Sequence, residues 1–349
     1  MSSTTFNCLE SLSNEVLLEI FEYLDAYDLC QSFYDLNTRI NTVLQLVHLH
    51  ILYDPSKSDA TIWNTLASFF NPSQIRILSL HNDINIHERI LTAPKENLHS
   101  VCLKNMNKDN IYKLIQHFPK HNQIKCFSVT APWNYSRSHG NSMIHLLLVE
   151  HGHRFTSLVN LSLWCATHGI DFPGVSVIFP QLRRLLINNF DFTSNFLGFL
   201  RNNTPNLRSL RCLQSYYASV TLTDIVIPNI RELHIYEPIE MAHLQNILSI
   251  FPCLRRLHTD RRLDHSYAAI DASVWQWLIE NRLPDLKQMT INLDDGVSQE
   301  AVKTFYNGDF WLRKKIIMKL KINKTSGSNP LVTTIYFGRQ WSFQYFDNL

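Results

Sequence analysis

The chain has 349 residues, of which 45% are hydrophobic and 18% are charged, and its formal net charge is +2. This composition is typical of a globular protein with one large domain or two, and the charge gives no reason to expect a nucleic-acid partner. No apolar run approaches the roughly 18 residues of a membrane span, and the first residues lack the basic region and apolar core of a secretory signal. The seven scattered cysteines form no CxxC pair. We therefore expect reduced thiols in a cytoplasmic or nuclear protein without a membrane partner.

Residues 9–45 predict a compact bundle of about three helices joined by short connections. Ser13 is suited to cap the first helix, and Glu15 lies in its first turn, where the helix dipole favours a carboxylate. Leu12 and Leu17 occupy the two positions of a hydrophobic staple. The second and third helices are expected in DAYDLCQSFYDL and NTRINTVLQLVHLH.

The first helix has more large apolar side chains than one packing surface requires. They form a stripe at helical spacing with two neighbours beside it, and two more fall outside it. The stripe is Val16, Ile20 and Leu24, the neighbours are Leu17 and Phe21, and the two outside are Leu18 and Tyr23. A bundle of this size cannot bury all of them alone, so it must pack on the rest of the chain, on another protein, or on both.

Most of the remaining chain repeats one short skeleton. Five segments share the pattern Pro-x-(Leu/Ile)-(Arg/Lys)-x-(Leu/Met)-x-apolar, relaxed to Cys or Thr at the last place, and weaker copies such as QIRILSL lie upstream. The central apolar positions of the nine copies are Leu78, Val101, Phe127, Leu161, Leu185, Leu210, Leu233, Leu257 and Met289. Successive positions are 23 to 34 residues apart, and the two longest intervals carry insertions near residues 130–142 and 260–272. This spacing is similar to that of leucine-rich repeats.

The repeat predicts a strand, a turn and a helix in each unit. The apolar alternation places both leucines on one side of a short strand, and segments such as MAHLQNILSIF and SVWQWLIENRL follow helical spacing. We therefore expect an α/β leucine-rich-repeat solenoid, a horseshoe with parallel strands on the concave side and helices on the convex side. The expected domains are a helical domain at residues 1–48, about nine repeats at 49–309 and capping strands at 310–349.

The N-terminal segment resembles an F-box over residues 9–45. The family pattern is roughly Leu-Pro-x-Glu-(apolar)3-x-Ile-Phe-x-x-Leu, then Asp-Leu, then a helix with a Trp-like position. The matching residues are Leu12, Glu15, Val16, Leu17, Leu18, Ile20, Phe21, Leu24, Asp28 and Leu29. Ser13 replaces the usual proline, and Ile40 occupies the usual Trp place. The resemblance implies that this segment binds the small adaptor of Skp–cullin–F-box ubiquitin ligases, and through it a cullin.

The resemblance also implies that the repeats hold a protein substrate, whose identity the sequence does not give. Outward positions on the predicted strands of the later repeats carry arginine and aromatic side chains, which are common interface anchors. The candidate target-binding residues are Trp164, Arg184, Arg211, His234, Tyr236, Arg256, His258 and Asp260. Scattered arginine favours an acidic or phosphorylated protein segment. The basic position after the first leucine of each repeat, as at Arg183 and Arg231, is expected to serve the repeat turn instead.

The sequence contains no motif of an enzyme active site, such as GxSxG, HExxH or a P-loop. The HLH at His48 and HGH at His151 have the wrong spacing for metal ligands on a helix, and Asp294-Asp295-Gly296 lacks the alternating carboxylates of a calcium loop. We therefore expect no catalytic residue, metal or cofactor.

Two functional readings follow. In the first, the chain is a non-catalytic substrate receptor of a ubiquitin ligase. In the second, the N-terminal helices only cap the solenoid, and the chain is a repeat scaffold or inhibitor unrelated to ubiquitin. Deletion of residues 1–45 is expected to leave the repeats folded in the first case and to unfold them in the second. An enzyme with its site in the insertions is a third reading with little support.

Overall fold

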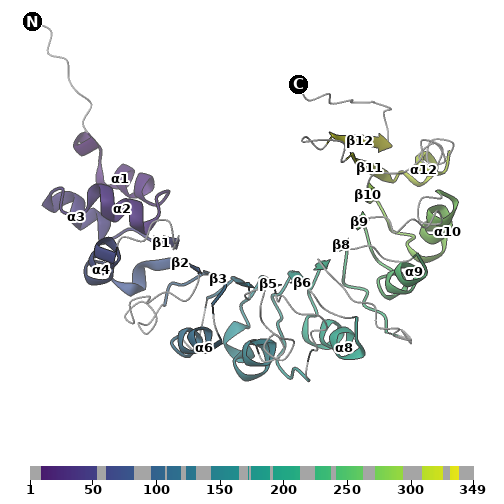
Figure 1. Ribbon diagram of the computed structural model, residues 1–349, viewed down its shortest axis with the longest axis horizontal. Coiled ribbons are helices and arrows are strands. Elements are labelled where there is room, and N and C mark those ends of the chain that lie inside the picture. The colour runs from purple at the N-terminus through teal and green to yellow at the C-terminus, as the bar shows by residue number, and fades with distance from the viewer. Residues whose placement is uncertain are drawn as a thin grey trace, which may run out of the picture. The chain divides into compact units, whose positions relative to one another are not determined.

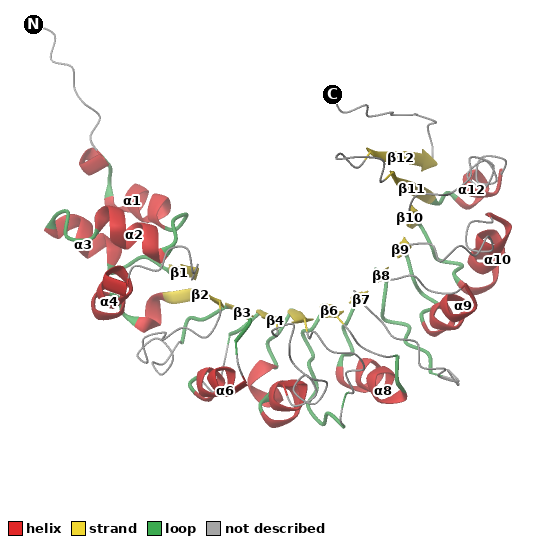
Figure 2. Cartoon of the chain, in the orientation of Figure 1, coloured by secondary structure: helices red, strands yellow, loops and turns green. Residues whose placement is uncertain are grey.

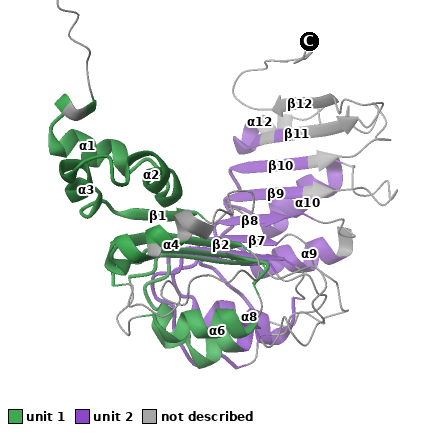
Figure 3. Cartoon of the chain, turned by 60° about the vertical axis from the view of Figure 1, so that its left-hand side comes forward, with its two compact units in different colours: residues 1–134, 146–158 green, residues 135–145, 159–349 purple. Residues whose placement is uncertain are grey.

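The computed structural model describes residues 9–52, 60–81, 96–106, 108–118, 123–130, 143–164, 172, 174–188, 192–212, 225–236, 241–261, 272–293, 309–324 and 331–337. The chain forms two compact units (Figure 3). Unit 1 comprises residues 1–134 and 146–158, and unit 2 comprises residues 135–145 and 159–349. The N-terminal helices therefore share a compact unit with the first strands of the repeats.

Unit 1 begins with a short 3-10 turn η1 (Leu9–Ser11) and three helices, α1 (Asn14–Phe21), α2 (Ala26–Phe33) and α3 (Thr38–Leu44) (Figure 1). A polar residue precedes each helix because its side chain can accept a hydrogen bond from a free backbone N–H of the first turn. Ser13, Asp25 and Asn37 do so over 3.4, 2.8 and 2.8 Å. The predicted cap at Ser13 is thus confirmed.

The third predicted helix is wrong at its C-terminal end. Helix α3 stops at Leu44, and HLHIL contributes to strand β1 (Leu49–Leu52), which pairs with β2 in parallel. Leu49 and Ile51 are fully buried while His50 between them is half-buried. This period of two is the pattern of a strand with one face against the core.

The rest of unit 1 contains repeats of a strand followed by helical turns. Its further elements are α4 (Ala60–Phe69), η3 (Pro72–Gln74), β2 (Ile75–His81), β3 (Ser100–Lys104), α6 (Lys108–Gln116), β4 (Cys126–Thr130), the π-helical turn η4 (His145–Glu150) and the 3-10 turn η5 (Gly152–Phe155). Strands β1 to β4 pair in parallel in chain order. The register aligns the predicted central positions Leu78, Val101 and Phe127, all of which are buried.

Unit 2 continues the same repeat. Its elements are β5 (Asn160–Trp164), β6 (Arg184–Asn188), α8 (Ser194–Asn203), β7 (Ser209–Cys212), β8 (Glu232–Ile235), α9 (Met241–Ile250), β9 (Arg256–Arg261), α10 (Ala272–Arg282), β10 (Gln288–Leu293), α12 (Asp309–Lys314), β11 (Ile317–Lys324) and β12 (Leu331–Phe337). Strands β5 to β11 are parallel neighbours in chain order, and β12 pairs antiparallel with β11. Helices α8, α9 and α10 all lie on one side of these strands (Figure 2).

The core of unit 2 is a continuous row of the predicted central positions. The register aligns them from each strand to the next, and all are at most 3% exposed. The aligned residues are Leu161, Leu185, Leu210, Leu233, Leu257 and Met289. No repeat could bury this row alone, whereas stacked repeats share it.

Two ladders of hydrogen bonds join consecutive repeats at the turns. The backbone carbonyl of the basic position accepts two N–H groups from the next repeat, as when Arg183 accepts from Arg208 and Ser209, each over 3.0 Å. The Asn206 side chain donates to the Pro180 carbonyl of the preceding repeat over 2.7 Å. These turns fix the pitch of the strands, so both units have the architecture of a leucine-rich-repeat solenoid. Among the described helices, none has the length and apolar character needed to cross a bilayer.

Candidate functional site

Helix α1 has two apolar sides, and only one of them is buried. Leu17 and Phe21 are fully buried, whereas Val16 is 41% and Ile20 is 37% exposed. Tyr23, directly after the helix, is 84% exposed. Val16, Ile20 and Tyr23 are spaced four and three residues apart, so they fall on one face of a helix. We call these three residues the α1 surface.

The structure divides the residues of the F-box-like pattern between core and surface. Leu17, Phe21, Leu29 and Ile40 are fully buried, so their side chains hold the bundle together and are not accessible to a partner. Leu12, Leu18 and Leu24 are partly exposed, and Ser13, Glu15, Val16 and Ile20 are exposed. Among the predicted adaptor contacts, the exposed and partly exposed positions are those that a partner can reach.

Further exposed apolar side chains of this bundle were not among the predicted contacts. Tyr34 is 40%, Leu36 is 54% and Leu46 is 64% exposed. They follow α2 and α3, where the sequence pattern becomes irregular, so helical periodicity carried no signal for them.

Polar contacts fix the orientation of α1 within the bundle. The Arg39 guanidinium donates from Nε to Asn14 Oδ1 over 2.9 Å and also donates to the Leu12 carbonyl. A hydrogen bond from Ser13 lowers the pKa of the Glu15 carboxyl, and Arg39 adds a smaller effect in the same direction. Arg39 therefore ties α3 to the start of α1, a contact between residues 25 and more positions apart that periodicity could not indicate.

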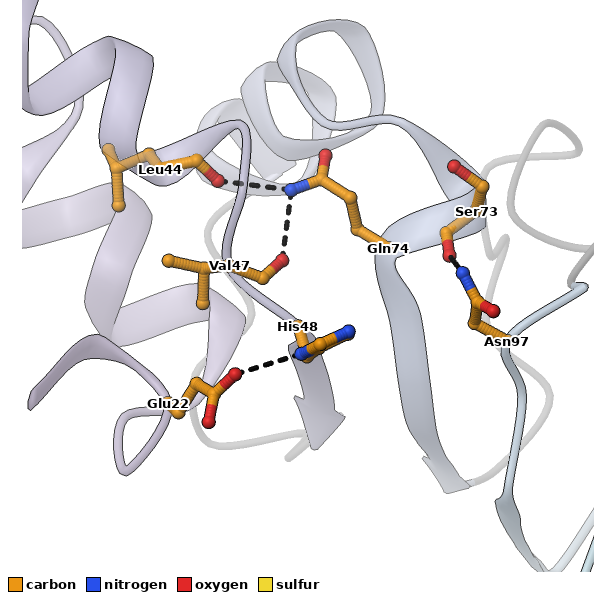
Figure 4. Close-up of polar contacts among 7 residues, drawn as sticks. All are labelled: Glu22, Leu44, Val47, His48, Ser73, Gln74 and Asn97. Carbon is orange, nitrogen blue, oxygen red and sulfur yellow. Dashed lines mark hydrogen bonds and ion pairs between the residues drawn. The ribbon is translucent and has the colours of Figure 1, made fainter. Parts of the chain in front are cut away.

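The Gln74 side chain joins the helical bundle to the first repeat (Figure 4). Gln74 Nε2 donates over 3.0 Å to the carbonyl of Leu44, the last residue of α3, and over 2.9 Å to the carbonyl of Val47, just after the helix. In addition, Glu22 Oε1 and His48 Nδ1 are 2.8 Å apart, and α2 packs on α4 and β1. Deleting residues 1–45 would therefore expose the first repeat under either functional reading, so this deletion does not discriminate between them.

The second candidate site is a cluster on the strands of unit 2. It consists of Arg211 on β7, Glu232 and His234 on β8, Tyr236 just after β8, and Arg256 and His258 on β9; we call it the β7–β9 cluster. The register aligns Arg211 with His234 and His234 with His258. These positions alternate with the buried leucines, so they lie on the opposite face of the strands from the core.

The rings in this cluster are packed against one another. The His234 and His258 rings are stacked with centroids 5.1 Å apart, and the Tyr236 and His258 ring centroids are 5.5 Å apart. Glu232 Oε1 lies 2.7 Å from His234 Nε2. Arg211 and Arg256 are exposed, while His234, Tyr236 and His258 are partly exposed. The cluster thus offers a surface of packed rings together with two exposed guanidinium groups.

Burial shapes the protonation of this cluster. Burial lowers the pKa of the His234 imidazole, Glu232 opposes that shift, and Arg211 and Arg256 reinforce it. The pKa of the Glu232 carboxyl is also lowered, because its hydrogen bond to His234 and the nearby arginines outweigh burial, the largest single influence, which acts to raise it. At neutral pH the imidazole is therefore neutral and hydrogen-bonded to a carboxylate.

The structure does not bring all predicted target-binding residues together. Arg184 on β6 is exposed and aligns with Ser209 on the neighbouring strand. Trp164 is on β5, is 36% exposed, and donates from its indole N–H to Ser162 Oγ over 2.9 Å. Asp260 lies on β9 and aligns with Asn292, but its side chain is outside the described part of the structure.

Within the described residues, no group of three or more His, Cys, Asp or Glu side chains is placed to hold a metal ion. His151 lies beside Tyr112 and His153 with ring centroids 5.7 and 6.4 Å apart. Asp294, Asp295 and Gly296 lie outside the described residues. The cysteines that the structure describes are free thiols, and burial raises the pKa of Cys30 and Cys212.

No family model matches the chain, and no curated protein matches it. Among solved structures, the chain is similar to the leucine-rich repeat-containing protein LegL7 from Legionella pneumophila. The similarity covers 86% of this chain and 88% of LegL7, with 16% sequence identity and a TM-score of 0.41.

Proposed function

We propose that the chain is a non-catalytic substrate receptor of a Skp–cullin–F-box type ubiquitin ligase. The N-terminal bundle binds the Skp-type adaptor, and the strand face of the repeats binds a protein target. Ubiquitin transfer is carried out by other subunits of the ligase. The proposal places the protein in the cytoplasm or the nucleus.

The observation that carries the proposal is the α1 surface. The bundle already has a core built on Leu17, Phe21, Leu29 and Ile40, so Val16, Ile20 and Tyr23 are not needed to hold it together. Exposed apolar side chains gathered on one short element favour a protein partner. Their place within an F-box-like sequence favours the Skp-type adaptor as that partner.

A paired substitution tests adaptor binding without weakening the helix. Val16→Glu with Ile20→Lys removes both exposed apolar side chains and creates a pair four residues apart in the favourable orientation. We expect purified Skp-type adaptor to bind the intact protein in calorimetric titration and to bind this variant about tenfold or more weakly.

The matched control is Trp277→Glu with Asn281→Lys on α10. It introduces the same two charges at the same spacing and also removes an exposed apolar side chain, since Trp277 is 47% exposed. The control should bind the adaptor as the unaltered protein does. Equal affinity of the Val16/Ile20 variant and the control would contradict the assigned contact.

The alternative is a repeat scaffold whose N-terminal helices serve as a cap. The contacts of Gln74 with the Leu44 and Val47 carbonyls favour a capping role in addition to any partner. The two functions are compatible, because capping uses the end of α3 and adaptor binding uses the α1 surface. The absence of any adaptor binding by intact, folded protein would leave the scaffold as the better account.

A further inference from the structure

The β7–β9 cluster combines three chemical features that the repeat fold itself does not require. Its rings stack, its arginines are exposed, and it contains a partly buried imidazole hydrogen-bonded to a carboxylate. In unit 1, the positions of the repeat that correspond to His234 are Ser79, Cys102 and Ser128, whose side chains carry neither a charge nor a ring. The cluster is therefore a local specialisation of the strand face.

We propose that the β7–β9 cluster binds an acidic peptide segment of the target protein, through carboxylates, and that binding tightens as the pH falls toward about 6. This inference rests on the proposed function only in taking the segment to belong to a ligase target.

Charge complementarity argues for an acidic occupant. Among the described side chains at outward positions of β6 to β9, three are arginines (Arg184, Arg211 and Arg256) and one is a carboxylate (Glu232), a formal sum of 3 − 1 = +2. Protonation of His234 would raise that sum to +3. Glu232 is already engaged by His234 at 2.7 Å, whereas Arg211 and Arg256 extend into solvent. An arginine that meets a carboxylate forms a charge-assisted hydrogen bond with specific geometry.

The dimensions argue for a peptide segment in preference to a small anion. Arg184 and Arg256 are on β6 and β9, three strand spacings apart, which corresponds to about 14 Å. An extended chain of about four or five residues spans that distance. The register row between these two arginines contains Ser209 and Glu232. The stacked His234 and His258 rings lie in the neighbouring row with Arg211, where they offer contact area for the apolar parts of such a segment.

The sign of the pH dependence follows from the surroundings of His234. Among the described side chains, the groups near it are Arg211 from β7, Glu232 and Tyr236 from its own strand, and Arg256 and His258 from β9. Burial and the arginines lower the pKa of the free imidazole. A bound carboxylate stabilises the imidazolium and raises that pKa. Binding therefore takes up protons, so affinity increases as the pH falls.

Fluorescence anisotropy with labelled peptides tests this inference on the full-length protein. The probe is a fluorescein-labelled peptide of about eight glutamates, and its glutamine counterpart is the uncharged control. We expect the glutamate peptide to bind at low salt and the glutamine peptide not to bind. Lowering the pH from about 8 to about 6 should strengthen binding about threefold or more, and His234→Gln should remove that increase.

Matched arginine pairs separate specific binding from general attraction. Arg211→Gln with Arg256→Gln should weaken binding about tenfold. Arg208→Gln with Arg255→Gln removes the same charge from exposed turn positions of the same repeats. This pair should change the affinity for the glutamate peptide less than about twofold. Circular dichroism of both variants establishes that they are folded.

Several results would overturn the inference. These are equal binding of the glutamine peptide, equal effects of the two arginine pairs, an affinity that does not rise as the pH falls, and binding of a phosphoserine peptide without binding of the glutamate peptide. Adaptor binding is measured on the same preparations. Protein that binds adaptor but not peptide overturns this inference alone, and protein that binds peptide but not adaptor overturns the proposed function alone.

Discussion

At the scale of single residues, an asparagine at the turn links three of the repeats to the repeat before them. Asn206 donates to the Pro180 carbonyl and Asn229 donates to the Pro205 carbonyl, each over 2.7 Å. In unit 1, Asn97 donates to the Ser73 carbonyl over 2.8 Å. All three correspond to the variable position x of the Pro-x-(Leu/Ile) pattern. This position therefore has a structural role wherever it is asparagine.

Asn206→Ala tests the strength of this link. Removing the amide leaves the Pro180 carbonyl without that donor, and we expect the free energy of unfolding in urea to fall by about 1 kcal/mol. Asn202→Ala is the control, because Asn202 is exposed near the end of α8 and alanine favours helix. Equal stability of the two variants would argue against a contribution from the ladder.

Three histidines are expected to make the folded chain less stable as the pH falls. Burial is the largest influence lowering the pKa of His50, His151 and His234, and Arg76, Arg154 and Arg211 respectively lower it further. A histidine whose pKa is lower in the folded chain than in the unfolded chain stabilises the fold above its unfolded pKa, and this stabilisation is lost as the pH falls.

The melting temperature in the absence of ligand should therefore decrease between about pH 7.5 and about pH 5.5. Replacing the three histidines with glutamine should reduce that decrease, because glutamine does not titrate. A melting temperature that rises on acidification would show that the histidines are not buried in the neutral form.

At the scale of elements, the turn after α6 depends on an arginine from a distant part of unit 1. Arg154 donates from Nη1 to the carbonyls of Ile115, Gln116 and Phe118 over 3.1, 3.0 and 2.8 Å. These are carbonyls at the C-terminal end of α6, which lack partners within the helix. A cation at this end also suits the helix dipole.

Arg154→Ala should lower the free energy of unfolding by about 1.5–3 kcal/mol, because charge-assisted hydrogen bonds to partly buried carbonyls are lost. Arg208→Ala removes an exposed arginine of the repeat turn and should cost less than about 0.5 kcal/mol. Urea unfolding of both variants makes the comparison. A loss of unfolding free energy for Arg154→Ala no larger than that for Arg208→Ala would contradict the role of Arg154 as a cap of α6.

The sequence was informative where apolar periodicity was regular. The alternation of leucines predicted the strands from β2 to β10 and their register within each unit, because a one-residue shift would expose every buried side chain. Strand β1 was missed because Leu49 and Ile51 directly follow a helix and extend its apolar run. Contacts between residues distant in the sequence, such as that of the Gln74 amide with the Leu44 carbonyl, leave no periodic trace in the sequence.

Less of the candidate sites than of the strands could be predicted from the sequence. The outward strand positions followed from alternation, so Arg211, His234, Arg256 and His258 could be proposed as one surface. Their ring stacking and the contact between Glu232 and His234 depend on side-chain geometry. On α1, the amount of apolar surface was evident, but which residues face the core was not. Leu17 and Phe21 are buried, and Val16 and Ile20 are exposed.

At the scale of the whole molecule, the two candidate surfaces belong to different compact units. The α1 surface is part of unit 1, and the β7–β9 cluster is part of unit 2. A receptor that binds a ligase adaptor and a target must present two separate surfaces, so substitutions in one unit should leave binding at the other unchanged.

Affinity capture of the intact protein from cells, followed by mass spectrometry, tests this account most directly. We expect a Skp-type adaptor and a cullin among the captured proteins, together with a target. With Val16→Glu and Ile20→Lys, the adaptor and cullin should be lost while the target remains. With Arg211→Gln and Arg256→Gln, the target should be lost while the adaptor remains. Capture of a target by folded protein without any Skp-type adaptor would contradict the account.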